Sequence, residues 1–426
     1  MPRAVRLAVL AVAGALILPA SAAQAGSGPC LPDYPHQGQC HVWTGKVSWV
    51  DDGDTLDAVI PGDGRGRVRV RFAGVQAMEL TSYRAGRRAG DCHALDATAR
   101  VERLVKRSKG RIRVSAQYPQ SRAAGRRLRS VSVRLGGRWR DVGRILLSEG
   151  LALWWPGHAE DASNARYIVL AQKAAAAGRG VYSPNACGLG PSEGHPLGLT
   201  VHWDADGIDQ DNVNGEYVKV RNYDPVNWLP LGGWWIRDSG LPRFTFPAGA
   251  AVAPGGSVTV HVGAGEDGGG EYFWNRRAPV FGNPTLDDPS TGDGAYLFDP
   301  QGDLRASMIY PCRVGCTNPA QGRIALTAQP RGDEYVALTN TGDSTLDLEP
   351  LLLAKAPFSY AFAAGATLGP GQTLRVHTRG DPAQDTATDL HWGMTGPILR
   401  DDGDVATLST YNDIPIACTA YGSRSC

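Results

Sequence analysis

The sequence predicts a multidomain chain, in which a small closed β-barrel carrying three helices is followed by two all-β sandwiches. Three observations support this prediction. Before residue 183, five strand-like runs are interleaved with three helix-like runs, whereas the part after residue 198 has short alternating runs and frequent Gly-Pro turns. That second part also repeats itself at an offset of 118 residues. Finally, 426 residues exceed the length of one ordinary domain.

Residues 1–25 are predicted to be a signal peptide. A positively charged start precedes an apolar run over 7–18, which is too short to span a bilayer. Ala23-Gln24-Ala25 then supplies small residues for cleavage, with Ala20-Ser21-Ala22 as the alternative. A membrane anchor is the competing interpretation. We expect a secreted protein, with no membrane span in its mature part.

The chain contains eight cysteines. An even number in an exported protein predicts disulfides rather than metal thiolates. Zinc is the alternative, but Cys312 and Cys316 have no second pair at zinc-finger spacing. Eight cysteines allow 105 pairings, and the sequence does not fix which one forms. We favour Cys30–Cys40, Cys92–Cys187, Cys312–Cys316 and Cys418–Cys426, because each bridge then stays within one apparent domain.

The first domain is expected over 44–183, preceded by an N-terminal extension over 26–43. Alternation and turn residues predict strands over 47–50, 55–60, 68–73, 111–116 and 128–135. Apolar periodicity predicts helices near 94–105, 141–150 and 162–178, the last two ended by Gly150 and Gly178. Five strands and three helices in this order are typical of a small closed barrel with helical additions.

A Gly- and Pro-rich linker is predicted over 184–198, followed by sandwiches over 199–312 and 313–426. The repeat is carried by matching positions: Glu216-Tyr217-Val218 with Glu334-Tyr335-Val336, Trp274 and Pro279 with Trp392 and Pro397, Pro254-Gly255 with Pro370-Gly371, and Gly292-Asp293 with Gly403-Asp404. Each repeat has the length of an antiparallel β-sandwich.

The two halves differ strongly in charge. Residues 41–190 hold 26 Lys and Arg against 13 Asp and Glu, whereas residues 191–426 hold 15 against 28. A basic surface confined to one half indicates a polyanion such as nucleic acid as the partner of the first domain. A solvated Arg-rich surface is the alternative interpretation.

The chemistry is concentrated within 28 residues of the first domain, in Asp52-Gly53-Asp54-Thr55, Arg71 and Glu79. Carboxylates on a tight Gly turn suit Ca²⁺ or Mg²⁺. Arg71 on the next strand can grip a phosphate with two hydrogen bonds, and Glu79 can accept a proton from water. Phosphodiester hydrolysis needs this combination.

A second arginine should approach the phosphate from another strand. Arg126 and Arg127 are the candidates, and only one can face the site because adjacent strand residues point to opposite sides. We favour Arg126.

Together these residues resemble the staphylococcal-nuclease (thermonuclease) family over residues 44–183. The resemblance rests on Asp52-Gly53-Asp54-Thr55, Val70-Arg71-Phe72-Ala73-Gly74-Val75 with Glu79, Gly125-Arg126, Glu149-Gly150-Leu151-Ala152 and Gly178-Arg179-Gly180-Val181-Tyr182. It implies an OB-type five-stranded barrel and Ca²⁺-dependent endonuclease action on DNA and RNA. By resemblance, Asp54 is a calcium carboxylate, Arg71 and Arg126 are the phosphate arginines, and Glu79 is the general base.

One departure affects the metal site. The family has a second calcium aspartate where this chain has Gln76, so one negative charge is lost. The amide oxygen of Gln76 and the backbone carbonyl of Ala77 remain candidate ligands, with Asp52 as a further one. Weaker calcium binding, another divalent ion, or an inactive nucleic-acid-binding protein are the open alternatives.

The two repeats resemble lamin-tail domains, Ig-like sandwiches attached to secreted bacterial nucleases. The resemblance rests on Glu216-Tyr217-Val218 with Arg221-Asn222, Leu231-Gly232-Gly233-Trp234, Pro254-Gly255, Glu334-Tyr335-Val336, Thr339-Asn340 and Pro370-Gly371. It implies tethering to a cell-envelope or matrix component. We expect Trp234, Trp235, Trp274 and Trp392 to fill the sandwich cores, and His261, His377 and His391 to be isolated.

The sequence therefore predicts a secreted, monomeric, metal-dependent endonuclease that hydrolyses phosphodiester bonds of DNA or RNA. The alternative is a catalytically weak or inactive extracellular protein that binds nucleic acid and is tethered by lamin-tail domains.

Overall fold

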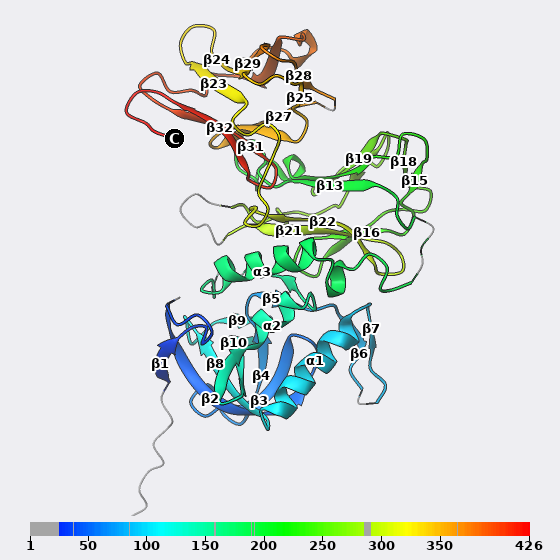
Figure 1. The fold of residues 1–426 in the computed structure, drawn as a ribbon, viewed down its shortest axis with the longest axis vertical. Coiled ribbons are helices and arrows are strands. Elements are labelled where there is room, and N and C mark those ends of the chain that lie inside the picture. Colours follow the sequence, from blue (N-terminus) through cyan, green and yellow to red (C-terminus); the bar gives the residue numbers. More distant parts are fainter. Residues whose placement is uncertain are drawn as a thin grey trace, which may run out of the picture.

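The computed structural model describes residues 25–426 except 37, 85, 157–158, 189, 191, 285–290 and 364. The predicted signal peptide lies outside the described residues, apart from Ala25. Figure 1 shows three stacked parts, with the N-terminal barrel and its helices at one end, a first sandwich in the middle and a second sandwich at the other end.

The N-terminal part is a closed barrel of five strands. Its strands are β2 (Gln39–Val50), β3 (Thr55–Val59), β4 (Arg67–Phe72), β8 (Arg111–Ala116) and β10 (Arg126–Leu135). They pair in the order β2-β3-β4-β10-β8, and β8 returns to β2, so the sheet has no free edge there. The barrel pairs are antiparallel except β4 with β10. The five predicted strands and their closure are confirmed.

Residues 26–43 are not an extension, contrary to the prediction. β1 (Gly26–Pro29) pairs with the start of β2, and β2 itself crosses the predicted boundary at residue 44. The remaining short strands of this part are β5 (Val75–Gln76), β6 (Leu80–Ser82), β7 (Ala89–Gly90), β9 (Arg122–Ala123), β11 (Arg138–Asp141) and β12 (Leu153–Trp154).

The three predicted helices are confirmed as α1 (Ala94–Arg107), α2 (Val142–Ser148) and α3 (Asn164–Ala176). Asp141 caps the N-terminus of α2, because its carboxylate accepts a 2.8 Å hydrogen bond from the backbone N–H of Arg144. Gly150 and Gly178 follow α2 and α3 with φ of 70° and 57°, so a left-handed glycine ends each helix as predicted.

The two sandwiches share one strand order, which confirms the repeat. In the first sandwich, one sheet has the strand order β13 (Leu197–His202), β14 (Tyr217–Asn222), β19 (Ser257–His261), β20 (Glu271–Phe273). The facing sheet has the order β17 (Arg243–Thr245), β16 (Trp235–Arg237), β21 (Asp293–Phe298), β22 (Leu304–Tyr310). In the second sandwich, the corresponding sheet has the order β23 (Ile324–Gln329), β24 (Tyr335–Asn340), β29 (Thr373–Arg379), β30 (Asp389–Met394). Its facing sheet has the order β27 (Phe358–Ala361), β26 (Leu351–Lys355), β31 (Val405–Thr410), β32 (Pro415–Ala420).

Each sandwich adds one two-stranded pair, β15 (Leu229–Pro230) with β18 (Ala251–Val252), and β25 (Leu346–Asp347) with β28 (Thr367–Leu368). Short 3₁₀ turns complete the chain at η1 (Gly180–Tyr182), η2 (Val213–Gly215) and η3 (Pro382–Gln384). The sandwiches are not wholly antiparallel, because β19 pairs with β20, and β29 with β30, in parallel.

The predicted tryptophan cores are confirmed for three of the four residues. Trp234 and Trp274 lie in the core of the first sandwich, and Trp392 lies in that of the second. Trp235 is also buried, but it faces the other way: it stacks on Phe298 at 4.1 Å and belongs to the apolar cluster of the barrel. Adjacent strand residues point to opposite faces, so only one of the two tryptophans can enter the sandwich.

The barrel and the first sandwich share one apolar core. Ile168 and Ala171 of α3 belong to the same buried cluster as Tyr296 and Ile309 of the first sandwich, and Figure 1 shows α3 between the two parts. The buried amide of Gln172 donates to the backbone carbonyls of Ile309 (2.9 Å) and Pro311 (2.8 Å) and accepts from the N–H of Arg313. No polar group of this amide is left without a partner.

All four predicted disulfides are confirmed. Cys92–Cys187 joins the barrel to the predicted linker, and β13 begins at Leu197 inside that linker. Among the described residues, no helix has both the length and the apolar character needed to cross a membrane. The disulfides are compatible with an extracellular protein.

Both sandwiches bury a glutamate at the start of a central strand. Glu216 accepts backbone hydrogen bonds from Val280 (2.8 Å) and Phe281, and burial raises its pKa to about 8. Glu334 accepts the equivalent bonds from Ile398 and Leu399, and a third one from the hydroxyl of Thr378 at 2.7 Å.

We predict that Glu216→Gln raises the free energy of unfolding selectively at alkaline pH. The folded carboxyl keeps its proton up to about pH 8, whereas the unfolded one loses it near its ordinary value of 4.5. Wild-type stability therefore falls as pH rises through this window. Glutamine has no proton to lose. The free energy of unfolding of the variant minus that of wild type, measured with urea, should therefore be larger at pH 9 than at pH 5 by about 2 kcal/mol or more. Glu334→Gln, which breaks a better-satisfied site, should lower stability at both pH values. A pH-independent effect of Glu216→Gln would contradict the prediction.

Candidate functional site

The Asp-rich turn lies between β2 and β3 and is buried. The carboxylate of Asp52 accepts a 2.9 Å hydrogen bond from the N–H of Asp54, which closes the turn. A side chain at Gly53 would place its Cβ 2.6 Å from the Cβ of Ala97 and 2.7 Å from that of Ala77. Only glycine lets the turn pack this closely under α1.

Asp54 ties the turn to the rest of the site. Its carboxylate accepts hydrogen bonds from the hydroxyl of Thr55 (2.9 Å) and the N–H of Ala77 (2.7 Å), and it lies 3.2 Å from Nη1 of Arg71. The turn and the segment after β5 are therefore held together by one buried carboxylate.

Arg71 is 2% exposed. Its guanidinium donates to the carbonyls of Phe72 (3.0 Å) and Val75 (2.7 Å) and to the amide oxygen of Gln76, and it lies 5.0 Å from the centre of the Trp155 ring. Since part of the planar fork is already engaged, Arg71 is held rigidly at the surface of a cleft that it lines.

Gln76 joins Arg71 to Glu79. Its oxygen accepts from Arg71, and its nitrogen donates to Oε1 of Glu79 (2.7 Å) and to the carbonyl of Ala77 (3.2 Å). The two candidate metal ligands contributed by Gln76 and Ala77 are thus hydrogen-bonded to other protein groups in this arrangement. A glutamine can make this bridge because its amide is a donor and an acceptor at once.

The carboxylates of the site crowd one another electrostatically. Burial raises the pKa of Asp52 to about 7, and the neighbouring Asp54 and Glu79 add to the effect. Burial and Asp54 also raise the pKa of Glu79, which Arg71 and Arg237 oppose. A cation placed among like charges would offset this repulsion.

Asp52 and Asp54 offer the carboxylate oxygens that Ca²⁺ and Mg²⁺ prefer. They do not form a tight group with a third acidic, His or Cys ligand: in the described part of the chain the one such group is Cys92, His93 and Cys187. That group holds no free thiolates, since its cysteines form a disulfide.

The structure separates Arg126 from Arg127. Arg126 lines the same cleft as Arg71, and its guanidinium donates to the hydroxyl of Thr55 at 3.3 Å. Arg127 points to the other side, where its Nε lies 3.8 Å from Asp63. The sequence preference for Arg126 agrees with this placement.

The cleft has a volume of about 750 Å³ and lies between the barrel and the first sandwich. The barrel contributes Arg71, Gln76, Arg122, Arg126 and Trp155, among others. The sandwich contributes residues from 238–242, 279–282 and Asp293. Sequence reasoning missed Trp155, Arg122 and every sandwich residue, since no local pattern places residue 240 opposite residue 71.

A family model described as Lamin Tail Domain matches residues 203–311 and 319–423, which together make up half of the chain. The chain belongs to the lamin tail domain family. The first and second sandwiches are its first and second lamin tail domains, as the resemblance predicted. The matched segments do not include the barrel. No curated protein matches the chain.

The histidines of the lamin tail domains are not isolated, contrary to the prediction. His377 and His391 face each other across the parallel pair β29–β30 with ring centres 5.3 Å apart. His377 also binds the carboxylates of Asp333 and Asp389, both at 3.1 Å. In the first lamin tail domain, His261 binds the carboxylate of Glu271 at 2.8 Å. The parallel pairing that brings them together was not predicted.

We predict that Arg71→Gln lowers the free energy of unfolding by about 3–5 kcal/mol, because it leaves Asp54 and two carbonyls buried without their partner. Arg400 is the control: its side chain and that of its partner Asp402 are 58% and 74% exposed, so Arg400→Gln should leave the free energy of unfolding almost unchanged. Chemical denaturation of both variants measures the difference. Equal effects would show that Arg71 is not part of the buried framework.

Proposed function

We propose that this chain is a secreted, metal-dependent endonuclease that hydrolyses phosphodiester bonds of DNA or RNA. The observation that carries the proposal is the placement of Arg71 and Arg126 on one cleft, beside the carboxylates of Asp54 and Glu79. Two guanidinium groups and neighbouring carboxylates are the parts that phosphoryl chemistry requires.

The fold supports an OB-type barrel of the staphylococcal-nuclease kind. Numbered along the chain, the five barrel strands pair in the order one, two, three, five, four, and the fourth returns to the first. The third and fifth strands, β4 and β10, run in parallel and carry Arg71 and Arg126. This pairing explains how two arginines 55 positions apart can line one cleft.

Each residue has a role in the proposed reaction. Arg126 binds the phosphate. Arg71, which is 2% exposed and already bonded to protein carbonyls, adds positive charge from the cleft wall, so that both guanidinium groups stabilise the charge that develops on the phosphate oxygens. Glu79 accepts the proton of the attacking water, and its pKa, which burial raises above the ordinary value of a glutamate, suits a general base. Gln76 orients Glu79 through its 2.7 Å hydrogen bond.

The proposed cofactor is Ca²⁺, with another divalent ion as the alternative. Asp54 and Asp52 would hold it, and the oxygen of Gln76 and the carbonyl of Ala77, which each already accept a hydrogen bond, would be further ligands through their second lone pair. When bound, the cation supplies positive charge to the phosphate oxygens.

The charge distribution supports a nucleic-acid substrate. Residues 41–190 carry twice as many Lys and Arg as Asp and Glu, 26 against 13. Such an excess raises the local concentration of a polyanion. The lamin tail domains are proposed to attach the protein to a cell-envelope or matrix component.

One observation favours a second candidate, a catalytically weak or inactive extracellular protein that binds nucleic acid. Gln76 occupies the place of a charged ligand, and its amide nitrogen is bonded to the proposed base. This candidate predicts salt-sensitive binding without turnover.

We predict that wild-type protein cleaves plasmid or RNA with at least one divalent ion, and that Glu79→Gln lowers the rate by a factor of about 10²–10⁴. The measurement is initial rates across a panel of divalent ions. Glu149→Gln is the control, because Glu149 pairs with Arg100 outside the cleft. Identical rates for Glu79→Gln and wild type would reject Glu79 as the base.

We predict that Gln76→Asp lowers the Ca²⁺ concentration needed for half-maximal cleavage several-fold, because it restores a ligand charge and removes the amide from Ala77 and Glu79. Gln76→Asn, which shortens the side chain without adding charge, is the control. If both substitutions change calcium dependence equally, the missing charge is not what limits the metal site.

A further inference from the structure

The cleft has two chemically different walls. On the barrel side lie the side chains of Arg71, Arg122 and Arg126, with Trp155 beside them. On the other side the first lamin tail domain contributes apolar residues from two loops, namely Leu241, Pro242, Pro279, Val280 and Phe281. One wall suits anionic groups, and the other suits flat apolar ones.

The loop at the tip of the apolar wall is held in one shape. It connects β16 to β17, and the guanidinium of Arg237, which is 3% exposed, donates to the carbonyls of Asp238 (3.1 Å), Ser239 (3.3 Å) and Gly240. Within this ordered loop Leu241 remains 53% exposed. A rigid loop that presents an apolar side chain to a cleft loses little conformational entropy on binding.

The acidic residues of this wall do not prevent an anion from binding. Asp238 and Asp293 both line the cleft. Burial raises the pKa of Asp238 to about 7, and the neighbouring Asp293 adds to the effect, while Arg237 opposes it. Around neutral pH the pair therefore carries less charge than two free carboxylates would.

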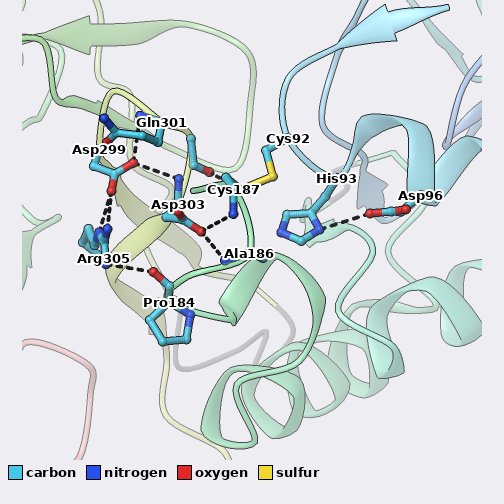
Figure 2. Close-up of a disulfide and its surroundings, with 11 residues drawn as sticks. Cys92, His93, Asp96, Pro184, Ala186, Cys187, Asp299, Gln301, Asp303 and Arg305 are labelled. Atoms are coloured by element: carbon cyan, nitrogen blue, oxygen red, sulfur yellow. Dashed lines mark hydrogen bonds and ion pairs between the residues drawn. A yellow bond between two sulfur atoms is a disulfide. The ribbon is translucent and has the colours of Figure 1, made fainter. Parts of the chain in front are cut away.

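The two walls are fixed relative to each other. Besides the shared core at α3, Figure 2 shows the Cys92–Cys187 disulfide between the barrel and the segment that leads into the first lamin tail domain. Asp303 of that domain accepts hydrogen bonds from the N–H groups of Ala186 (2.7 Å) and Cys187 (2.9 Å), and Arg305 donates to the carbonyl of Pro184 at 2.8 Å. The disulfide and these hydrogen bonds tie the two walls together in the arrangement that forms the cleft.

We propose that the first lamin tail domain forms the base-binding wall of the nuclease cleft, where Leu241 contacts unpaired bases of a single-stranded nucleic acid whose phosphates lie on Arg122 and Arg126. A duplex hides the faces of its bases in its own stack, so only an unpaired strand can use both walls. This inference rests on the proposed function for the identity of the ligand, but it concerns binding and not hydrolysis.

The test is the binding of a fluorescently labelled single strand of about ten nucleotides to the full chain, measured by anisotropy in Ca²⁺ at fixed salt. The protein carries Glu79→Gln so that the strand is not cut. Leu241→Asp should weaken binding about tenfold, and Leu241→Trp should strengthen it several-fold, because an indole stacks on a base. Val226→Asp is the matched control, since Val226 is a 76% exposed apolar residue of the same domain outside the cleft.

Unchanged affinity in both Leu241 variants would overturn the proposal, as would an equal loss in Val226→Asp. Failure of the endonuclease proposal can be told apart from failure of this one. If none of the divalent ions tested supports cleavage by wild type, but the Leu241 variants still change single-strand affinity, the base-binding wall stands and the endonuclease proposal falls. If duplex of the same length binds as tightly as the single strand and responds equally to Leu241→Asp, the preference for unpaired bases is wrong.

Discussion

The packing of α3 against the first lamin tail domain is the contact on which the candidate site depends. Ile168 and Ala171 of this helix share an apolar core with Tyr296 and Ile309, and the amide of Gln172 satisfies three backbone groups across the junction. A predominantly apolar junction of this kind behaves like the interior of a domain rather than like a hinge. The cleft between barrel and lamin tail domain follows from it.

Buried charge is the second constraint. The charged side chains of Asp52, Asp54, Arg71 and Glu79 lie close together below the surface. Burial, with a smaller contribution from Asp54, raises the pKa of the carboxyls of Asp52 and Glu79. The neutral side-chain amide of Gln76 lies between two of these charges, where it accepts a hydrogen bond from Arg71 and donates one to Glu79. The same amide that costs the site a ligand charge also gives the arginine and the glutamate fixed orientations.

The two lamin tail domains use one strand order in different surroundings. In the first domain the sheet that contains β16 and β22 turns its outer face to the barrel, which is why Trp235 is buried against Phe298 outside the sandwich core. The second domain packs on the first through contacts such as the indole of Trp203 with the carbonyl of Tyr411 at 2.6 Å. The first lamin tail domain thus forms one wall of the cleft that the barrel residues line from the other side.

The sequence by itself determined the elements whose signals are local: the five barrel strands, the helices ended by Gly150 and Gly178, the repeat, and the disulfides. Periodicity, turn residues and spacing act over a few residues or a fixed interval, so they can be recognised in the chain alone. It also brought Asp54, Arg71 and Glu79 together as one set. Only the tertiary structure decided that Arg71 is buried, that Gln76 bridges to Glu79, and that residues 238–242 face the site. Those outcomes depend on which distant surfaces pack together, and packing is decided by the fit of whole faces rather than by any local pattern.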